Sequence, residues 1–272
     1  MNFLERLLSV CRQQQSLLCV GLDPDPGRLP SAVRHHDDPI LAFNQAIVEA
    51  TAPWAAAFKP NIAFYEALGP SGLQTLRQTV NFIHTHTPAL VIVDAKRGDI
   101  AHTMAAYARA LLDELQADAV TLHPYLGSEA LAPFLERADR GCFVLCRTSN
   151  PGAGEFQDLL IDGRPLYLVV AEHVRDWNRH GNCGLVVGAT FPQELARVRA
   201  LCPELPILVP GVGAQQGDLE AAVRAGVDSS GERILVNLSR TILYASAGKD
   251  FAEAAARVAE QTCTAIRQTR FR

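Results

Sequence analysis

Residues 17–23 read LLCVGLD, a short apolar run that ends in an aspartate and is followed by a turn sequence. Such a run, with turn residues at its boundary, predicts a buried β-strand. The near-continuous apolar character indicates burial on both faces, as in a parallel sheet. Seven further runs share this character and lie at residues 55–62, 89–96, 118–124, 142–148, 184–190, 206–213 and 233–240.

The segments between these runs have the length and apolar period of helices. Examples are DDPILAFNQAIVEA (37–50), PSGLQTLRQTVNFIH (70–84) and GDLEAAVRAG (217–226). Alternating strand and helix units with no linker-like tract between them favour a closed (β/α)8 TIM barrel over a doubly wound α/β sheet. We therefore expect residues 1–272 to form a single (β/α)8 barrel domain with an amphipathic N-terminal helix.

Composition limits the class of partner. The formal charge is −4, and 48% of the residues are apolar and 20% charged. The sequence has no basic run and no basic stripe interleaved with aromatic residues, so it argues against a nucleic-acid partner. No apolar stretch approaches the ~18 residues of a membrane span, and the N-terminus lacks a signal-peptide pattern. Seven scattered cysteines are expected to be buried thiols. We expect a cytoplasmic protein that acts on a small molecule.

In a (β/α)8 barrel the active site lies at the carboxyl ends of the strands. The third predicted strand ends in DAKRGD, where alternation along the strand places Asp94 and Lys96 on the same side, and Asp99 follows in the loop. Two flanking carboxylates favour the ammonium form of Lys96, which suits a general acid and not a Schiff-base lysine. An ion pair that only closes the barrel end remains an alternative.

Further charges lie at the ends of neighbouring strands. Lys59 ends the second strand and Asp23 ends the first. Either side chain alone could simply be solvated, but four strand-end charges that converge on one mouth indicate a functional site. His123 also lies at a strand end, and we interpret it as a structural hydrogen-bonding residue.

Two loops complete the predicted site. The loop after the fifth strand (149–165) is long for this type of connection, which is typical of a lid, and Ser149 lies at its start; a simple turn is the alternative. PGVGAQ (210–215) and NLSR (237–240) occupy the quadrant that often binds phosphate, with Gln215 and Arg240 as ligands. Arg240 could instead be a surface residue. Metal-binding and nucleotide-binding motifs are absent from the sequence, so no cofactor is expected.

At DAKRGDI (94–100) the sequence resembles orotidine 5′-phosphate decarboxylases, in their longer bacterial form (type 2). The likeness extends over roughly residues 1–270. The other motifs that carry it are GLDPD (21–25), FKPNIAFYEALGP (58–70), LHPYLGSEAL (122–131), CRTSNPGAGEFQ (146–157), GLVVGAT (184–190), LVPGVGAQ (208–215) and NLSR (237–240). Each motif is weak alone, but their ordered set is highly specific.

The resemblance implies a (β/α)8 homodimer that converts orotidine 5′-phosphate to uridine 5′-phosphate and CO2, the last step of de novo pyrimidine nucleotide synthesis, without a cofactor. It implies that Lys96 donates the proton to C6, that Asp94 lies beside the substrate carboxylate, and that the partner subunit lends Asp99 and Thr103. The remaining implied contacts are Lys59 and Asp23 with the ribose, Ser149 with the pyrimidine edge, and Gln215 and Arg240 with the phosphate. The sequence departs from the family at Ala101 and Gln216, where glycine is expected.

Two alternatives remain open. A metal-dependent phosphosugar decarboxylase or aldolase on the same barrel would use a related Asp/Lys strand end. A non-enzymatic module that binds a phosphorylated ligand would show affinity without turnover.

Overall fold

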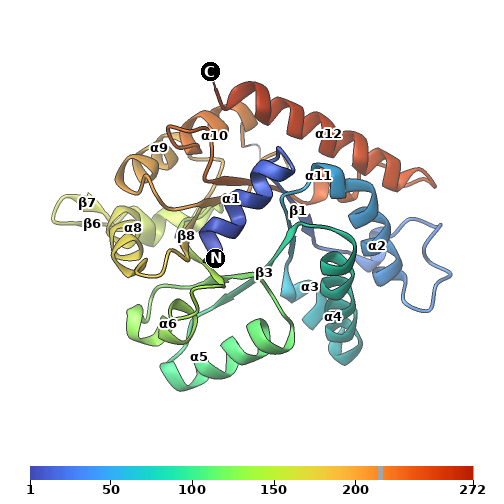
Figure 1. Cartoon of the computed structure of the whole chain (residues 1–272), viewed down its shortest axis with the longest axis horizontal. Helices are drawn as coiled ribbons and strands as arrows, with labels where there is room; N and C mark the ends of the chain where they lie inside the picture. The colour runs from blue at the N-terminus through green and yellow to red at the C-terminus, as the bar shows by residue number, and fades with distance from the viewer. Residues whose placement is uncertain (214–216, 272) are drawn as a thin grey trace.

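The computed structural model describes residues 1–213 and 217–271 and contains a closed barrel of parallel strands surrounded by helices (Figure 1). All the strands predicted from the apolar runs are present in the barrel, so the predicted (β/α)8 fold is confirmed. The barrel strands are β1 Leu18–Leu22, β2 Ala57–Pro60, β3 Leu90–Arg97, β4 Ala119–Leu122, β5 Gly141–Arg147, β8 Cys183–Val187, β9 Ile207–Val209 and β10 Ile234–Leu238.

Around the barrel the strands follow the order β1, β10, β9, β8, β5, β4, β3, β2, and β2 pairs again with β1. Helices connect successive strands and cover the outside. They are α1 Phe3–Gln13, α2 Pro39–Thr51, α3 Ile62–Glu66, α4 Gly69–His86, α5 Ala101–Ala108, α6 Gly127–Leu135, α7 Gly154–Gln157, α8 Leu166–Trp177, α9 Pro192–Leu201, α10 Leu219–Gly226, α11 Arg240–Leu243 and α12 Phe251–Thr269. Short helical turns occur at η1 Pro26–Arg28, η2 Ala52–Trp54, η3 Arg109–Glu114 (a π-helical turn) and η4 Pro151–Ala153.

The strands are apolar because they are buried on both sides, by the barrel interior and by the helical layer. Every residue of β1, β4 and β10 is buried. Each fully buried Val, Leu or Ile side chain contributes roughly 1.5–3 kcal/mol to folding. All seven cysteines are buried as free thiols, and burial raises the pKa of the Cys11 and Cys19 thiols to about 12. None of the helices in the described part of the chain is long and apolar enough to span a membrane.

The connection after β5 contains regular secondary structure, whereas the sequence predicted a long loop. It includes α7 and a two-stranded antiparallel hairpin, β6 Leu160–Ile161 and β7 Arg164–Pro165. Asp162 and Gly163 form its turn with φ angles of 48° and 76°. The Asp-Gly pair is the signal that could have predicted this hairpin, because such turns require positive φ at both central residues.

Helix α1 lies across the amino end of the barrel (Figure 1). Its start is stabilised by a capping box, in which Asn2 Oδ1 accepts the Glu5 N–H at 2.9 Å and the Glu5 carboxylate accepts the Asn2 N–H at 2.8 Å. Phe3 is fully buried and packs edge-on against Phe143 of β5, with ring centroids 5.9 Å apart. The helix therefore closes one end of the barrel and leaves the other end for the site.

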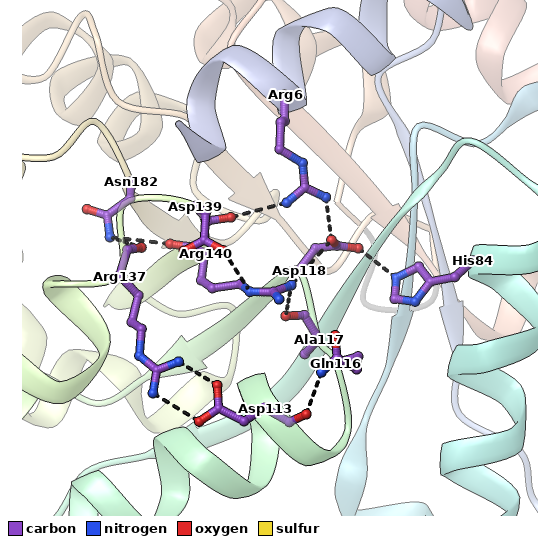
Figure 2. Close-up of polar contacts among 10 residues, drawn as sticks. All are labelled: Arg6, His84, Asp113, Gln116, Ala117, Asp118, Arg137, Asp139, Arg140 and Asn182. Carbon is purple, nitrogen blue, oxygen red and sulfur yellow. Dashed lines mark hydrogen bonds and ion pairs between the residues drawn. The ribbon is translucent and has the colours of Figure 1, made fainter. Parts of the chain in front are cut away.

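A buried carboxylate links α1 to the strands at this closed end. Asp118 lies just before β4 and accepts hydrogen bonds from Arg6 Nη2 at 2.5 Å and from the Val91 N–H at 2.8 Å. Its Oδ2 also lies 2.9 Å from His84 Nε2 of α4. Figure 2 shows the contacts of Asp118 with Arg6 and His84. Burial alone would raise the pKa of Asp118, but the hydrogen bonds with His84, Val91 and Arg6 outweigh it and hold that pKa below its ordinary value.

We predict that Asp118→Asn lowers the free energy of unfolding by about 2–4 kcal/mol at pH 7, because it leaves donors on three elements without their charged acceptor. The folded-state pKa of Asp118 is lowered, so its stabilising contribution is present above the unfolded pKa of about 4 and is lost as the pH falls through the folded value. Urea denaturation followed by circular dichroism at pH 7 and pH 3 measures both effects.

Asp113→Asn is the matched control for this substitution. Asp113 pairs with Arg137 at the surface, also visible in Figure 2, and should affect stability little because solvent screens the pair. Equal destabilisation by the two variants, or a loss in Asp118→Asn that does not shrink at low pH, would contradict the proposed contribution of Asp118.

Candidate active site

A cavity of about 520 Å³ opens at the carboxyl ends of the barrel strands. Its lining includes six of the residues predicted from the sequence: Asp23, Lys59, Asp94, Lys96, Ser149 and Arg240. They come from the ends of β1, β2, β3 and β5 and from the start of α11, which follows β10. The predicted convergence of strand-end side chains at one mouth is therefore present in the structure.

The centre of this cavity is a line of alternating charges. Asp94 Oδ2 accepts a hydrogen bond from Lys59 Nζ at 3.0 Å, and Asp94 Oδ1 accepts one from Lys96 Nζ at 2.6 Å. Lys59 is only 3% exposed, whereas the side chain of Lys96 is about half exposed and faces the cavity. The sequence has three lysines, and two of them are in this array.

Burial and charge act in opposite directions on this array, and charge dominates. Burial alone would lower the pKa of Lys59, but Asp94 and Asp23 outweigh it and hold that pKa well above its ordinary value. Burial alone would raise the pKa of Asp94, but Lys59 and Lys96 outweigh it and hold that pKa well below its ordinary value. These shifts keep Asp94 ionised and Lys59 protonated at neutral pH.

The strand that carries Asp94 and Lys96 is not regular, although the prediction relied on regular alternation. The register between β3 and β4 shifts between Val93 and Arg97, which marks a β-bulge. Lys96 has a φ of 47°, in the left-handed region that non-glycine residues seldom adopt. The two side chains do lie together, but a local bulge directs Lys96 into the cavity.

Asp23 provides a further acceptor in the lining of the cavity. Within residues 1–213 and 217–271, Asp23 Oδ1 is buried and has no hydrogen-bond partner. A buried carboxylate oxygen without a donor is unfavourable unless a ligand supplies one. Because Asp23 lines the cavity, a ligand hydroxyl could donate to it.

The loop after β5 forms one wall of the cavity. The Gln157 side chain accepts the Thr148 N–H at 2.8 Å and donates to Thr148 Oγ1 at 2.9 Å, which ties the end of α7 to the end of β5. Ser149 packs on Gly188 so closely that a Cβ on Gly188 would lie 2.6 Å from the Ser149 Cβ. Glycine at 188 is therefore required for Ser149 to reach the cavity.

The predicted phosphate quadrant is described in part. Arg240 is exposed, begins α11 and lines the cavity. Gly211 also lines it and has a φ of 95°, a backbone conformation that favours glycine. Gln215 and Gln216 lie outside the described residues.

Two predicted residues that the structure describes, Asp99 and Thr103, do not line the cavity. Asp99 Oδ1 accepts the N–H of the adjacent Ile100 at 2.8 Å, and Thr103 lies in the first turn of α5. His123, which the sequence reading treated as structural, lines the cavity, and its Nδ1 lies 3.3 Å from the Tyr125 backbone nitrogen.

Several cavity residues were missed by the sequence reading. A polar residue within an otherwise apolar strand was the available signal for Thr121 in AVTL and Asn237 in ILVNL. Turn residues next to strand ends gave no comparable signal. The missed polar residues that line the cavity are Asn61, Thr121, Thr148, Asn150, Gln157, Asn237 and Ser239. In the described ranges, no three His, Cys, Asp or Glu side chains are grouped in a way that could hold a metal ion.

Known proteins with similar sequences share one activity in their names. The orotidine 5′-phosphate decarboxylase of Thermomicrobium roseum is 55% identical over 273 residues, which cover 99% of this chain and 96% of that protein. The enzyme of the same name from Ralstonia pickettii is 50% identical over 272 residues, which cover 99% of this chain and all of that protein.

Structure and family comparisons agree with this result. The solved OMP decarboxylase of Leishmania donovani superposes with a TM-score of 0.85 at 40% identity, covering 98% of this chain and 100% of that one. A family model described as orotidine 5′-phosphate decarboxylase / HUMPS family matches residues 16–258. On this evidence, the chain belongs to the orotidine 5′-phosphate decarboxylase / HUMPS family.

Proposed function

We propose that this chain is a carboxy-lyase that converts orotidine 5′-phosphate to uridine 5′-phosphate and CO2, in the last step of de novo pyrimidine nucleotide synthesis. The observation that carries the proposal is the array of Lys59, Asp94 and Lys96 at the barrel mouth. It supplies a buried anion and a half-exposed ammonium where a substrate carboxylate would bind. The names and high identity of the relatives support the same substrate.

The array suits a decarboxylation that forms an unstabilised carbanion. When the bond between C6 and the carboxylate breaks, CO2 leaves and the electron pair stays on C6, where the ring offers no adjacent electron sink. The Lys96 ammonium stabilises this charge as it develops and then donates a proton from Nζ to C6. Water reprotonates the Lys96 amine after product formation.

Asp94 acts on the other reacting group. Its carboxylate would lie beside the substrate carboxylate, and repulsion between like charges would disfavour the bound ground state. Lys59 contributes by keeping Asp94 ionised, as the lowered pKa of Asp94 indicates. We assign no cofactor to the reaction, because the protein's own ammonium group supplies both the charge and the proton.

The rest of the cavity suits the remaining parts of the nucleotide. The buried Asp23 Oδ1 and the Lys59 ammonium would bind ribose hydroxyls. Ser149 would contact the edge of the pyrimidine, and Gln215 and Arg240 would bind the phosphate. Arginine suits this role because its planar guanidinium can meet two phosphate oxygens at once.

We further propose that residues 1–272 act as one barrel domain with an N-terminal helix and that two such chains form a homodimer in the cytoplasm. Asp99 and Thr103 would then reach the site of the partner subunit. Large exposed apolar residues beside the mouth support an interface there: Ile100 is 64% exposed and Tyr125 is 87% exposed. Free buried thiols are typical of a reducing compartment.

A single assay separates this function from the two alternatives. Loss of the orotate absorbance when purified protein is mixed with orotidine 5′-phosphate would exclude a binding module without turnover. Activity that persists in excess chelator would exclude a metal-dependent phosphosugar enzyme acting through its metal. Absence of turnover with this substrate would overturn the proposed function.

Lys96→Ala should reduce kcat by about 10²- to 10⁴-fold, because the general acid is lost. The circular dichroism spectrum should stay unchanged. The exposed Lys249→Ala is the matched control and should keep full activity. Near-normal turnover by Lys96→Ala would remove this lysine as the proton donor.

Arg240→Ala should lower kcat/KM for orotidine 5′-phosphate by a factor that corresponds to about 2–5 kcal/mol of transition-state stabilisation, because the bound phosphate loses its charged partner. Since the unphosphorylated nucleoside has no phosphate, its slow turnover should be the same in the variant and the wild type. Steady-state kinetics on both substrates, with the surface variant Arg224→Ala as control, tests this. Equal impairment on both substrates would mean that Arg240 does not bind the phosphate.

The shared site predicts complementation between two inactive variants. Lys96→Ala and Asp99→Ala homodimers should each be nearly inactive, but a hybrid would combine intact Lys96 of one chain with intact Asp99 of the other. Random pairing makes half of the dimers hybrids with one good site each, so activity should recover to about a quarter of wild type. If native mass spectrometry detects hybrids and no activity returns, Asp99 serves its own chain.

A further inference from the structure

The bulge that carries Asp94 and Lys96 faces a single residue of the neighbouring strand. Val93 pairs with Val120 and Arg97 pairs with Leu122, so three residues of β3 lie opposite one residue of β4. That residue is Thr121, which is 1% exposed and lines the cavity. A bulge leaves backbone groups without partners in the ladder, and they must be satisfied in another way.

The Thr121 hydroxyl accepts one hydrogen bond from the backbone of the bulge and donates one to a side chain of the bulge. Thr121 Oγ1 accepts the backbone N–H of Lys96 at 2.9 Å and donates to Asp94 Oδ1 at 2.8 Å. One hydroxyl can make both bonds because it has one donor hydrogen and two acceptor lone pairs. The same Asp94 Oδ1 accepts the hydrogen bond from Lys96 Nζ.

These two hydrogen bonds hold the backbone of Lys96 and the side chain of Asp94. Lys96 has a φ of 47°, which is unfavourable for a residue with a side chain and persists only where surrounding contacts enforce it. The hydrogen bond that the Lys96 N–H donates to Thr121 Oγ1 is such a contact. Its bond to Asp94 fixes the carboxylate that holds the Lys96 ammonium.

We infer that Thr121 is a positioning residue for the decarboxylation, whose hydroxyl holds the strained Lys96 backbone and the Asp94 carboxylate in the geometry that directs the Lys96 ammonium at the reacting carbon. The inference rests on the proposed role of Lys96. Thr121 itself takes no proton from the substrate. Its effect should therefore appear in the chemical step and not in substrate binding.

Thr121→Val is the variant that tests this inference, because valine keeps the shape of threonine and removes the hydroxyl. We expect kcat to fall about 10- to 100-fold, as small displacements of a catalytic group reduce the rate by such factors. KM should stay within about twofold, since substrate contacts are retained. Thr121→Ser restores the hydroxyl and should keep kcat within about threefold of wild type.

Thr51→Val is the matched control for loss of a buried hydroxyl. Thr51 is fully buried at the end of α2, and its hydroxyl donates to the Ile47 carbonyl at 2.7 Å, away from the cavity. This variant should lower the melting temperature without changing kcat. If Thr121→Val does not fold, Thr121→Cys, with a weaker and longer donor, provides the same comparison.

The outcomes separate this inference from the function on which it rests. Wild-type kcat in Thr121→Val together with an inactive Lys96→Ala would overturn the role of Thr121 alone. Active Lys96→Ala would overturn the proposed role of Lys96. A kcat loss in Thr121→Ser as large as in Thr121→Val, or an equal loss in Thr51→Val, would also overturn the inference, because the specific hydroxyl would then not be what matters.

Discussion

The site depends on the carboxylate of Asp94, which binds the ammonium groups of Lys59 and Lys96 with its two oxygens. An isolated carboxylate at this depth would be strongly destabilised, because burial removes it from water. Two cations and the Thr121 hydroxyl compensate that loss and keep Asp94 ionised. Removing either lysine would leave the buried carboxylate with less compensating charge, and removing the hydroxyl would cost it a hydrogen bond, so the four groups function as one unit.

The polar groups at the two ends of the barrel differ: those at the amino end stabilise the fold, and those at the carboxyl end line the candidate site. At the amino end, Asp118 is hydrogen-bonded to Arg6 of α1 and His84 of α4 (Figure 2). It also accepts the Val91 N–H of β3, so it links these three elements. At the carboxyl end, Lys96 is half exposed, and Asp23 has an oxygen with no hydrogen-bond partner among the described residues. A closed network favours rigidity, whereas unsatisfied groups in a cavity favour a ligand.

The bulge in β3 explains how a rigid barrel can present a lysine with the required direction. In a regular strand the direction of the Lys96 side chain would follow from simple alternation between the two faces. Here the extra residues of the bulge and the positive φ of Lys96 turn the side chain toward the cavity. Such a conformation is unfavourable locally and is maintained by β4, which pairs with β3 before and after the bulge, at Val93 and Arg97. The fold therefore supplies the energy that keeps the proposed proton donor in place.

The sequence alone determined the architecture and the Asp, Lys and Arg residues of the site. Apolar runs of strand length and helical segments between them are local signals, so eight strands and a (β/α)8 barrel could be predicted from them. Strand-end position then identified Asp23, Lys59, Asp94, Lys96, Ser149 and Arg240, because the carboxyl ends of parallel strands must meet at one mouth.

Only the tertiary structure decided the features that depend on contacts between distant segments. The bond between Thr121 and Lys96 spans 25 positions, and the contact of Arg6 with Asp118 spans 112, so no local pattern reveals either. The bulge at Lys96 likewise follows from the register of two strands and not from their composition. Hydrophobic periodicity specifies which face of an element is buried, but the packing of many elements together decides which polar groups meet.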